Sequence, residues 1–533
     1  MFLTRFLVLG NRSFFRRLVV IIFAFSYFLN VAVAQTVLQL TTDVGAEPQA
    51  KLEISLQRAI DLAIRNNRDI KSAYLDRLSD KFELHVAKGL FVPDLSISSQ
   101  AQAARVGEPL LRSDEELLDV SVEASTLLPT GGRVSLTYGT STSRSSVPTI
   151  SSSPESFTQT NVNLSFIQPL LRGGGVGIAR ASLTQAEINE RGRVLGLKGV
   201  LIDTVTDTLI AYRQYLLEQN QLIITERSLK RSRELVATTE ALIKSGRLAD
   251  LDLIQAEATL AQRELDLESV RNATDAARLN LINILDIDLD TQITLVDQLN
   301  VDAVIEPTLE QAYDAVLNQQ PAYLQALLGL ESAKVDLRLA RNNRLWDLDA
   351  EISVDLDDDR EGTFNGALTN VFSDRGDVRV GLRLTIPFGD RTRKQGVANA
   401  RITQRQQELQ LNELLDSIRI SLKDQLRTLK SFRNQVALAL RAEELTRRQL
   451  ELEKIKLNLG RTTNFQVTEF EDELIASQLN TASITTSFLN AAATLEQFMG
   501  VTLDTWQIPL QAQRYGYDDI QSQASFESVF EEN

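Results

Sequence analysis

Apolar residues recur at intervals of three and four positions between residues 418 and 440. The set is Ile418, Leu422, Leu426, Leu429, Phe432, Val436 and Leu440. This spacing places all of them on one face of a helix, and the charges around them are typical of the flanks of a coiled-coil seam. We therefore predict a long helix with a packed seam here.

Two stretches of the chain contain no proline, the residue that breaks helices most strongly. They are bounded by Pro169 and Pro307 and by Pro387 and Pro509. A glycine interrupts each stretch, Gly246 lying 77 residues after the first proline and Gly460 lying 73 after its counterpart. Residues 178–244 alone would form a helix about 100 Å long at 1.5 Å per residue. We predict two long antiparallel helical hairpins, about 178–286 and about 390–500, with tips at 245–252 and 459–466.

Period-two alternation marks the segments before these hairpins, at about 93–168 and 347–387. The apolar positions are Leu95, Ile97, Ala101, Ala103, Val162, Leu164, Phe166, Leu348, Ala350, Ile352, Val354, Leu356, Val378, Val380, Leu382, Leu384 and Ile386. One apolar and one polar face suit a strand of an outer-membrane barrel, although a half-buried strand pair in a soluble protein looks similar. We predict four principal strands.

The first half carries 35 extra residues between its helix start and Pro169. They include an alternating pair of segments around the turn at 129–132, which is a hairpin signature. Whether this hairpin joins the sheet is left open by the pattern. The Ser/Thr-rich stretch 140–156 and the acidic stretch 357–362 read as exposed loops.

The layout is internally repeated. Ser55 and Thr308 occupy equivalent positions as N-caps, each before an expected helix of about 35 residues. We assign residues 55–300 to one repeat and 301–510 to the second. The acidic segment 511–533 is expected to be a disordered tail.

The N-terminal segment predicts export. Four arginines precede the apolar run 18–29, and Ala32-Val33-Ala34 offers small residues at a cleavage site. This indicates a signal peptide over 1–34, followed by an extension over 35–54; a membrane anchor is the alternative, but the run is short for the about 20 residues that spanning requires. Elsewhere no apolar run is long enough for a spanning helix, so membrane entry would require strands.

Composition narrows the chemistry. Removing the signal arginines takes the formal charge from −15 to −19, which argues against nucleic acid or anionic lipid surfaces as partners. The chain has no Cys and a single His, His85, so zinc sites and histidine-based catalysis lack their residues. We expect no enzyme activity, no cofactor and no metal site.

Four strands cannot close a barrel, and an unpaired sheet edge costs several kcal/mol per backbone group in lipid. Other copies of the chain must therefore complete the wall. Three copies would supply a 12-stranded β-barrel and a cylinder of twelve helical segments, an α-barrel. The predicted fold is mainly α with a membrane β part.

At this point the chain resembles the TolC-like outer-membrane efflux protein family over essentially all of its mature length. The matching features are the duplicated plan, the strand-to-helix junctions at 168–175 and 386–389, and the hairpin tips at 246–257 and 460–469. At the second tip Gln466 stands where the family has an acidic residue. The junction and tip are specific together, and neither is specific alone.

The resemblance implies a homotrimeric exit duct in the outer membrane of a Gram-negative-type bacterium, reaching into the periplasm. Such a duct serves a tripartite efflux or type I secretion system as a passive channel. Its implied partners are a periplasmic adaptor (membrane fusion) protein, an inner-membrane pump or ABC transporter, and outer-membrane lipid. A periplasmic coiled-coil adaptor or scaffold is the alternative. The sequence does not identify the exported substrate.

Candidate functional residues follow from these motifs. Asp252, Gln466 and Glu469 are gate candidates, because threefold symmetry would turn each into a ring of three; solvated helix faces are the alternative. Candidates for the hairpin tips and for adaptor contact are Gly246, Arg247, Asp250, Gly460, Arg461 and Asn464. Asp250 and Asn464 are also suited to cap the helix that follows each tip. The strand-to-helix junctions are marked by Pro169, Gly173, Pro387 and Gly389.

Overall fold

The computed structural model describes residues 51–106, 113–146, 155–244, 250–302, 304–358, 377–458 and 461–509. The chain divides into two units, residues 1–52 and 53–533, and only residues 51 and 52 of the first are described. The predicted signal peptide, most of the extension and the acidic tail lie outside the described residues, as does most of the loop predicted at 357–362.

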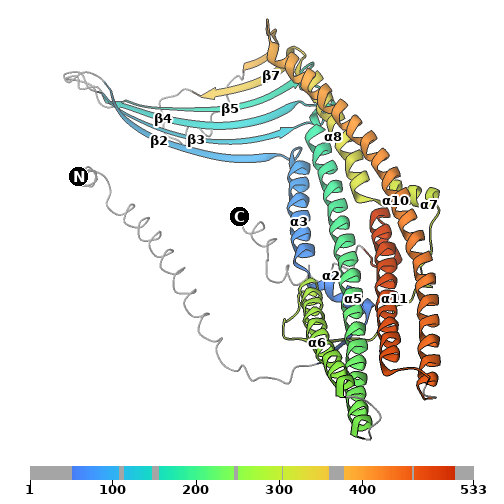
Figure 1. The fold of residues 1–533 in the computed structure, drawn as a ribbon. Coiled ribbons are helices and arrows are strands. Elements are labelled where there is room, and N and C mark those ends of the chain that lie inside the picture. The colour runs from blue at the N-terminus through green and yellow to red at the C-terminus, as the bar shows by residue number, and fades with distance from the viewer. Residues whose placement is uncertain are drawn as a thin grey trace, which may run out of the picture. The chain divides into compact units, whose positions relative to one another are not determined.

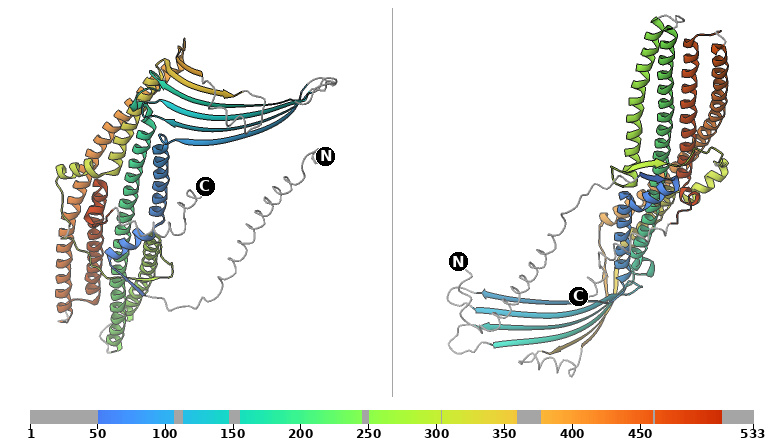
Figure 2. Two further views of the ribbon diagram at one scale, coloured as in Figure 1. Left: turned by 180° about the vertical axis from the view of Figure 1, so that it is seen from behind. Right: turned by 90° about the horizontal axis from the view of Figure 1, so that it is seen from below.

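Four long helices form two antiparallel hairpins. Their bounds are α5 (Ala181–Lys244), α6 (Asp250–Leu285), α10 (Arg391–Asn458) and α11 (Asn464–Met499). They lie side by side in the order α6, α5, α11, α10, as both views in Figure 2 allow the reader to follow. With 64 and 68 residues, α5 and α10 are each about 100 Å long at 1.5 Å per residue. Among the described helices, none has the length and apolar character needed to cross a bilayer.

The predicted seam packs α10 against α11. Ile418, Leu422 and Leu429 are fully buried, and they join a core that includes Phe488 of α11. The prediction that Leu440 belongs to the packed seam is wrong, because its side chain is 52% exposed. At that point Ala439 is the buried residue, so the packed face has shifted by one position.

The two hairpins contact each other through α5 and α11. Arg213 of α5 donates a hydrogen bond from Nη1 to the carbonyl oxygen of Leu489 at 2.7 Å, and burial lowers the pKa of Arg213 to about 10. Burial also raises the pKa of Glu496, although the nearby Arg213 opposes that shift. Gln497 donates to Asp203 at 2.7 Å. These polar contacts fix α11 on α5 beside the apolar core that the two helices share.

Each hairpin is preceded by two shorter helices, where the sequence suggested one of about 35 residues. They are α2 (Leu56–Asn66), α3 (Arg68–Gly89), α7 (Leu309–Gln319) and α8 (Pro321–Asn343). The caps at Ser55 and Thr308 are confirmed, and Thr308 forms a full capping box with Gln311. The single-helix expectation is wrong because Asn67 leaves the helical conformation and caps α3, while Pro321 has no N–H to continue α7.

Shorter elements lie where the long and short helices meet. A two-stranded sheet pairs β1 (Lys51–Ile54) with β6 (Gln292–Leu295), and α4 (Val176–Ala179) and α12 (Thr502–Thr505) each form one turn. Ile54 is fully buried in a core with residues of α5 and α6. Tyr212 of α5 is also buried there, and its hydroxyl lies 2.7 Å from Oδ2 of Asp297. That oxygen also accepts the N–H of Leu56 at 2.6 Å, so Asp297 ties α2 to α5.

The other six described strands form one antiparallel sheet in the order β2-β3-β4-β5-β7-β8 (Figure 1). Their bounds are β2 (Asp94–Val106), β3 (Ser113–Leu127), β4 (Arg133–Ser146), β5 (Glu155–Pro169), β7 (Asp347–Asp358) and β8 (Asp377–Thr385). The expected four-strand contribution, and with it the count of twelve for three copies, is wrong. The inserted hairpin, β3 and β4, pairs in full register between β2 and β5.

The loop predicted over 140–156 is also wrong at both ends. Residues 140–146 continue β4 and residues 155–156 begin β5, while 147–154 lie outside the described residues. Threonine is β-branched and therefore suits a strand as well as a loop. Cross-strand hydroxyl pairs hold the segment, with Thr140 to Thr160 at 2.9 Å and Thr142 to Thr158 at 3.2 Å.

A glycine at the end of α11 gives a test of the helix packing. Gly500 adopts a φ of +76°, and an added Cβ would lie 2.7 Å from the carbonyl oxygen of Gln319. We expect Gly500→Ala to destabilise the protein by about 2 kcal/mol or more, from left-handed strain and from backbone overlap. The measurement is the thermal denaturation midpoint of the detergent-solubilised protein.

The matched control is Gly192→Ala within α5, where an added Cβ meets no atom within 4 Å. Alanine there should be neutral or stabilising by up to about 1 kcal/mol, because it restricts the unfolded chain and favours the helix. Equal midpoints for the two variants would contradict the packing described at Gly500.

Candidate functional site

One face of the sheet carries rows of apolar residues from edge to edge, and the hydroxyl pair of Thr140 and Thr160 lies further along the same face. Directly opposed residues lie on the same face of an antiparallel sheet, and the register aligns Ile97, Val122, Tyr138, Val162 and Leu356 across five strands. Exposed members of this face are Leu95, Ile97, Leu118, Leu136, Leu164, Ile352, Val378, Val380, Leu382 and Leu384. Ile97 is 72% exposed and Val380 is 76% exposed. A soluble monomer rarely exposes so large an apolar surface.

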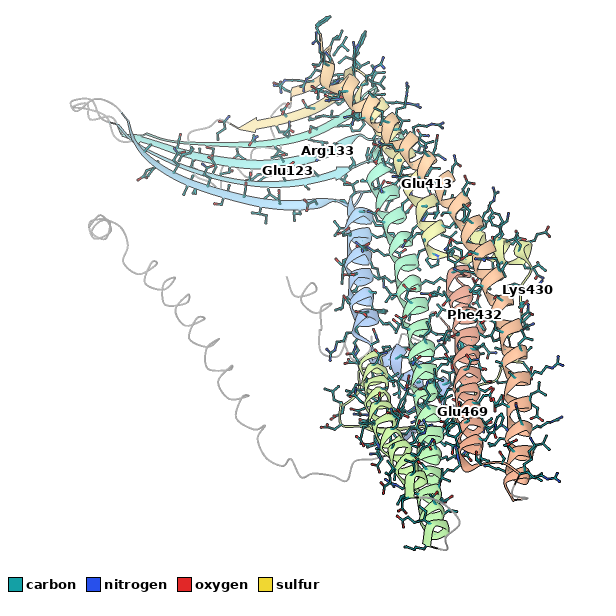
Figure 3. All side chains as sticks on the ribbon, viewed as in Figure 1. Glu123, Arg133, Glu413, Lys430, Phe432 and Glu469 are labelled. Carbon is teal, nitrogen blue, oxygen red and sulfur yellow. The ribbon has the colours of Figure 1, made fainter. Side chains whose placement is uncertain are left out.

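The opposite face is polar and hydrogen-bonded from strand to strand. Ser98 pairs with Ser121 at 2.7 Å, and Ser135 with Ser165 at 2.6 Å. Arg383 of β8 binds Glu351 of β7 at 2.9 Å. Charged residues continue this face across the sheet, among them Glu123 on β3 and Arg133 at the start of β4 (Figure 3). This face is suited to contact water.

Both edges of the sheet are open within the described residues. β2 pairs only with β3, and β8 only with β7. All nine residues of β8 are exposed. Successive strands alternate in direction, so β2 and β8 run in opposite directions and present the edges that an antiparallel pair between two copies requires.

The predicted junctions connect this sheet to the helices. Pro169 is the last residue of β5, and Gly173 follows in a turn with a φ of +83°. The N–H of Gly173 donates to Oδ1 of Asn342 at 2.7 Å, and Asn342 donates in return to the carbonyl oxygen of Leu171 at 3.2 Å. After β8 and Pro387, Gly389 adopts a φ of +75°. Both glycines occupy left-handed conformations that other residues rarely adopt.

The structure describes only part of the predicted tips. Gly246, Arg247 and Gly460 lie outside the described residues, as do the side chains of Asp252 and Asn464. Asp250 is the first described residue of α6 and is exposed. Arg461, Gln466 and Glu469 are also exposed, and Figure 3 places Glu469 near the tip end of α11. Among the described residues of one chain, no contact joins Asp252 to Gln466 or to Glu469.

The capping role predicted for Asn464 is wrong. α11 begins at Asn464, and the residue before it, Thr463, is the N-cap. The hydroxyl of Thr463 accepts the N–H of Gln466 at 3.4 Å. The side chain of Gln466 accepts a hydrogen bond from Thr462 at 3.1 Å, so Gln466 contributes to the order of this turn.

Ion pairs behind the tips were missed by the sequence reasoning. Glu471 of α11 binds Lys454 of α10 at 2.8 Å and lies 3.7 Å from Arg231 of α5. Asp472 pairs with Arg263 of α6. Two adjacent acids of α11 therefore contact the three other long helices. The acidic run at 469–473 was a visible signal, but its partners lie in other helices and could not be assigned without the fold.

Asp472 has an altered proton affinity. Burial raises its pKa, Glu469 and Glu471 add to the rise, and Arg263 opposes it. A raised pKa means that the folded state binds the proton more tightly than the unfolded state. The stability linked to this proton is fully present below the ordinary value of 3.8 and is lost as pH rises through the raised pKa.

Asp472→Asn tests this linkage because asparagine does not titrate. We expect wild-type protein to lose thermal stability relative to the variant as pH rises from below 4 through the raised pKa. Midpoints of both proteins in the same detergent between pH 3.5 and 7.5 measure the difference. A difference that stays constant, or that grows in favour of wild type as pH rises, would contradict the described environment of Asp472.

Comparison with known proteins supports an outer-membrane channel fold. The family model described as "Outer membrane efflux protein" matches residues 110–286. No curated protein matches the chain by sequence. Among solved structures, CusC, described as forming a transmembrane channel, has a TM-score of 0.63 at 15% identity, covering 87% of this chain and 95% of CusC.

Two further structures are similar. The CmeC outer membrane channel of Campylobacter jejuni has a TM-score of 0.62 at 14% identity, covering 84% of this chain and 86% of CmeC. The outer membrane protein VceC of Vibrio cholerae has a TM-score of 0.59 at 14% identity, covering 84% of this chain and 96% of VceC. These likenesses show a common fold. Together with the family match, they confirm the resemblance of the chain to the TolC-like outer-membrane efflux protein family.

Proposed function

We propose that the chain is one subunit of a homotrimeric exit duct in the outer membrane, serving a tripartite efflux or type I secretion system. The observation that carries this proposal is the sheet, whose apolar face is exposed and whose two edges are open. In lipid, open edges would leave backbone groups without hydrogen-bond partners, at several kcal/mol each. When the open edges pair with strands of further copies, these backbone groups gain hydrogen-bond partners. The apolar face remains exposed to lipid.

Three copies would bring eighteen of the described strands into one wall, with β8 of each copy paired to β2 of the next. The apolar face would then meet lipid, and the polar face would line a water-filled lumen. Twelve long helical segments would continue the wall below. The repeat predicted over 55–300 and 301–510 would make the helical part of this ring nearly regular, because each half supplies one long hairpin and two shorter helices.

The helical edges support the same assembly. α10 forms one edge of the helical layer, and α3 and α6 form the other. Exposed apolar residues along α10 include Ile402, Leu409, Ile420, Leu438, Leu445 and Leu452. Exposed apolar residues on the opposite edge are Leu75, Phe82, Val86, Leu251, Ile254 and Leu265. The copies would bury these two stripes against each other, just as they pair the strand edges.

The conduction mechanism is passive. The hairpin tips would dock a periplasmic adaptor protein, with an inner-membrane pump or ABC transporter supplying the energy. Gly246, Arg247, Asp250, Gly460, Arg461 and Asn464 are the candidates for that contact. Asp252, Gln466 and Glu469 would form rings that narrow the closed end. Opening would tilt α11 away from α5, and the ion pairs of Glu471 and Asp472 would resist this movement.

Cross-linking tests the shared wall, because the chain has no Cys of its own. We expect Ser98→Cys on β2 combined with Gly381→Cys on β8 to give covalent dimers and trimers with a short bis-maleimide reagent. In the control, Thr137→Cys on the interior strand β4 replaces the β2 cysteine. Equal yields from the two pairs, or clean release of a monomer from the periplasm without detergent, would favour the soluble scaffold instead.

Single-channel recording in planar bilayers tests the gate. We expect Asp252→Ala, Glu469→Ala and the double variant to raise conductance and to reduce cation preference, because each removes a ring of three negative charges. Glu413→Ala is the control, since this exposed acid lies on α10 far from the tip (Figure 3). Unchanged conductance and ion preference in all three tip variants would remove the gate proposal and leave the duct intact.

A further inference from the structure

Apolar and basic side chains gather where the sheet meets the helices. β2, β4 and β7 begin at this end of the sheet, and β3, β5 and β8 finish there. Leu170, Trp346 and Phe388 stand just beyond β5, β7 and β8 in this region and are 50%, 53% and 92% exposed. Leu170 directly follows β5 and Trp346 directly precedes β7, each an even number of residues from the apolar positions of its strand, so both extend the apolar face. Phe388 lies in the turn after Pro387, close to the end of β8.

The charge here is opposite to that of the whole chain. The connecting segments at this end are residues 88–94, 128–133, 169–180, 341–349 and 385–394. They hold nine Arg or Lys residues against four Asp residues, although the chain carries −15. The overall charge argued against anionic lipid as a partner, but the local charge favours it.

Some of these basic groups have structural partners. Arg172 and Arg393 both pair with Asp347, next to Trp346. The N–H of Arg172 donates to the carbonyl oxygen of Trp346 at 3.2 Å, and Arg393 donates to that of Leu345 at 3.0 Å. The position of Trp346 is therefore fixed by the neighbouring strand and helix.

Other basic groups remain available. Arg341, Arg344, Arg391 and Lys394 are exposed, and no ion pair joins any of them to another residue that the structure describes. Arg341 and Arg344 end α8 immediately before Trp346, and Arg391 and Lys394 begin α10 shortly after Phe388. Unpaired cations beside exposed aromatic rings are the composition of a membrane interface, where rings sit among headgroups and long basic chains reach the phosphates.

We propose that this junction belt, formed by Leu170, Trp346, Phe388, Arg341, Arg344, Arg391 and Lys394, binds phospholipid headgroups of the membrane leaflet that faces the helices and prefers anionic ones. The inference rests on the proposed function, because it requires the sheet to be inserted in a bilayer. Continuity with the apolar face places the belt at the bilayer boundary. Charge complementarity selects anionic phosphate groups over zwitterionic ones.

Tryptophan fluorescence offers a direct test, since the chain has two tryptophans, Trp346 and Trp506. Trp506→Phe leaves Trp346 as the reporter. The full-length variant is reconstituted into vesicles that mix phosphatidylcholine and phosphatidylglycerol, with one lipid at a time carrying bromine as a quencher. The ratio of the two quenching curves gives the relative association of each lipid next to Trp346.

We expect phosphatidylglycerol to associate about three to ten times more strongly than phosphatidylcholine, given the gain known for each basic residue near an anionic surface. The triple change Arg344→Gln, Arg391→Gln and Lys394→Gln should bring the ratio close to one. The charge-preserving pair Arg344→Lys and Arg391→Lys should keep the preference. The control triple Lys423→Gln, Lys430→Gln and Arg441→Gln removes the same charge from exposed positions further along α10, and should leave the ratio unchanged.

Two kinds of failure are distinguishable. Vesicles that conduct ions through the reconstituted protein but leave Trp346 unquenched, or show the same lipid ratio before and after the triple change, would overturn the belt and leave the duct standing. Protein that neither floats with vesicles nor forms channels would overturn the duct itself.

Discussion

The requirement that every backbone N–H and C=O in a sheet find a partner governs this structure. Within the described residues each interior strand has a hydrogen-bonded neighbour on both sides, whereas β2 and β8 each leave one side open. The same strands place their apolar side chains on one face, because the register keeps opposed residues in step from β2 to β8. An open strand edge and an exposed apolar face both cost free energy in water. Pairing of several copies within a bilayer would remove both costs.

The helical layer follows a related logic. Buried seams join α10 to α11 and α5 to its neighbours, while polar contacts such as Arg213 to Leu489 occupy the join between the two hairpins. Apolar packing holds each hairpin together without directional demands. Between the hairpins, hydrogen bonds accompany the apolar core that α5 and α11 share, and they depend more sharply on geometry than apolar packing does.

Much of this architecture could be read from the sequence, because long regular elements repeat their signal many times. The seam from Ile418 to Val436, the caps at Ser55 and Thr308, and the glycine turns of the junctions were predictable for this reason. The strand count was not, because the pattern of the 113–146 hairpin gave its strands but not their neighbours. The capping of α11 was misassigned by one residue, since Thr463 and Asn464 are both good caps and only backbone geometry separates them.

The candidate site was harder to predict than the fold. Gate and docking candidates came from single positions relative to a glycine, and part of that region lies outside the described residues. The pairs of Glu471 and Asp472 join residues far apart in the chain, which no local pattern contains. The junction belt was hidden in another way, because the average charge of the chain has the opposite sign to the charge of this region.

The length of α11 has a mechanical consequence. α11 has 36 residues, about 54 Å at 1.5 Å per residue, and its C-terminal half is anchored by Phe488, Leu495 and the Gly500 turn. A rod that pivots at one end is a lever. Once the ion pairs of Glu471 and Asp472 part, a pivot of about 10° near residue 500 would carry the tip end about 9 Å, simply from that length. Strain confined to a few contacts near residue 500 would thus become a large displacement at the opposite end, without unfolding any turn of the helix.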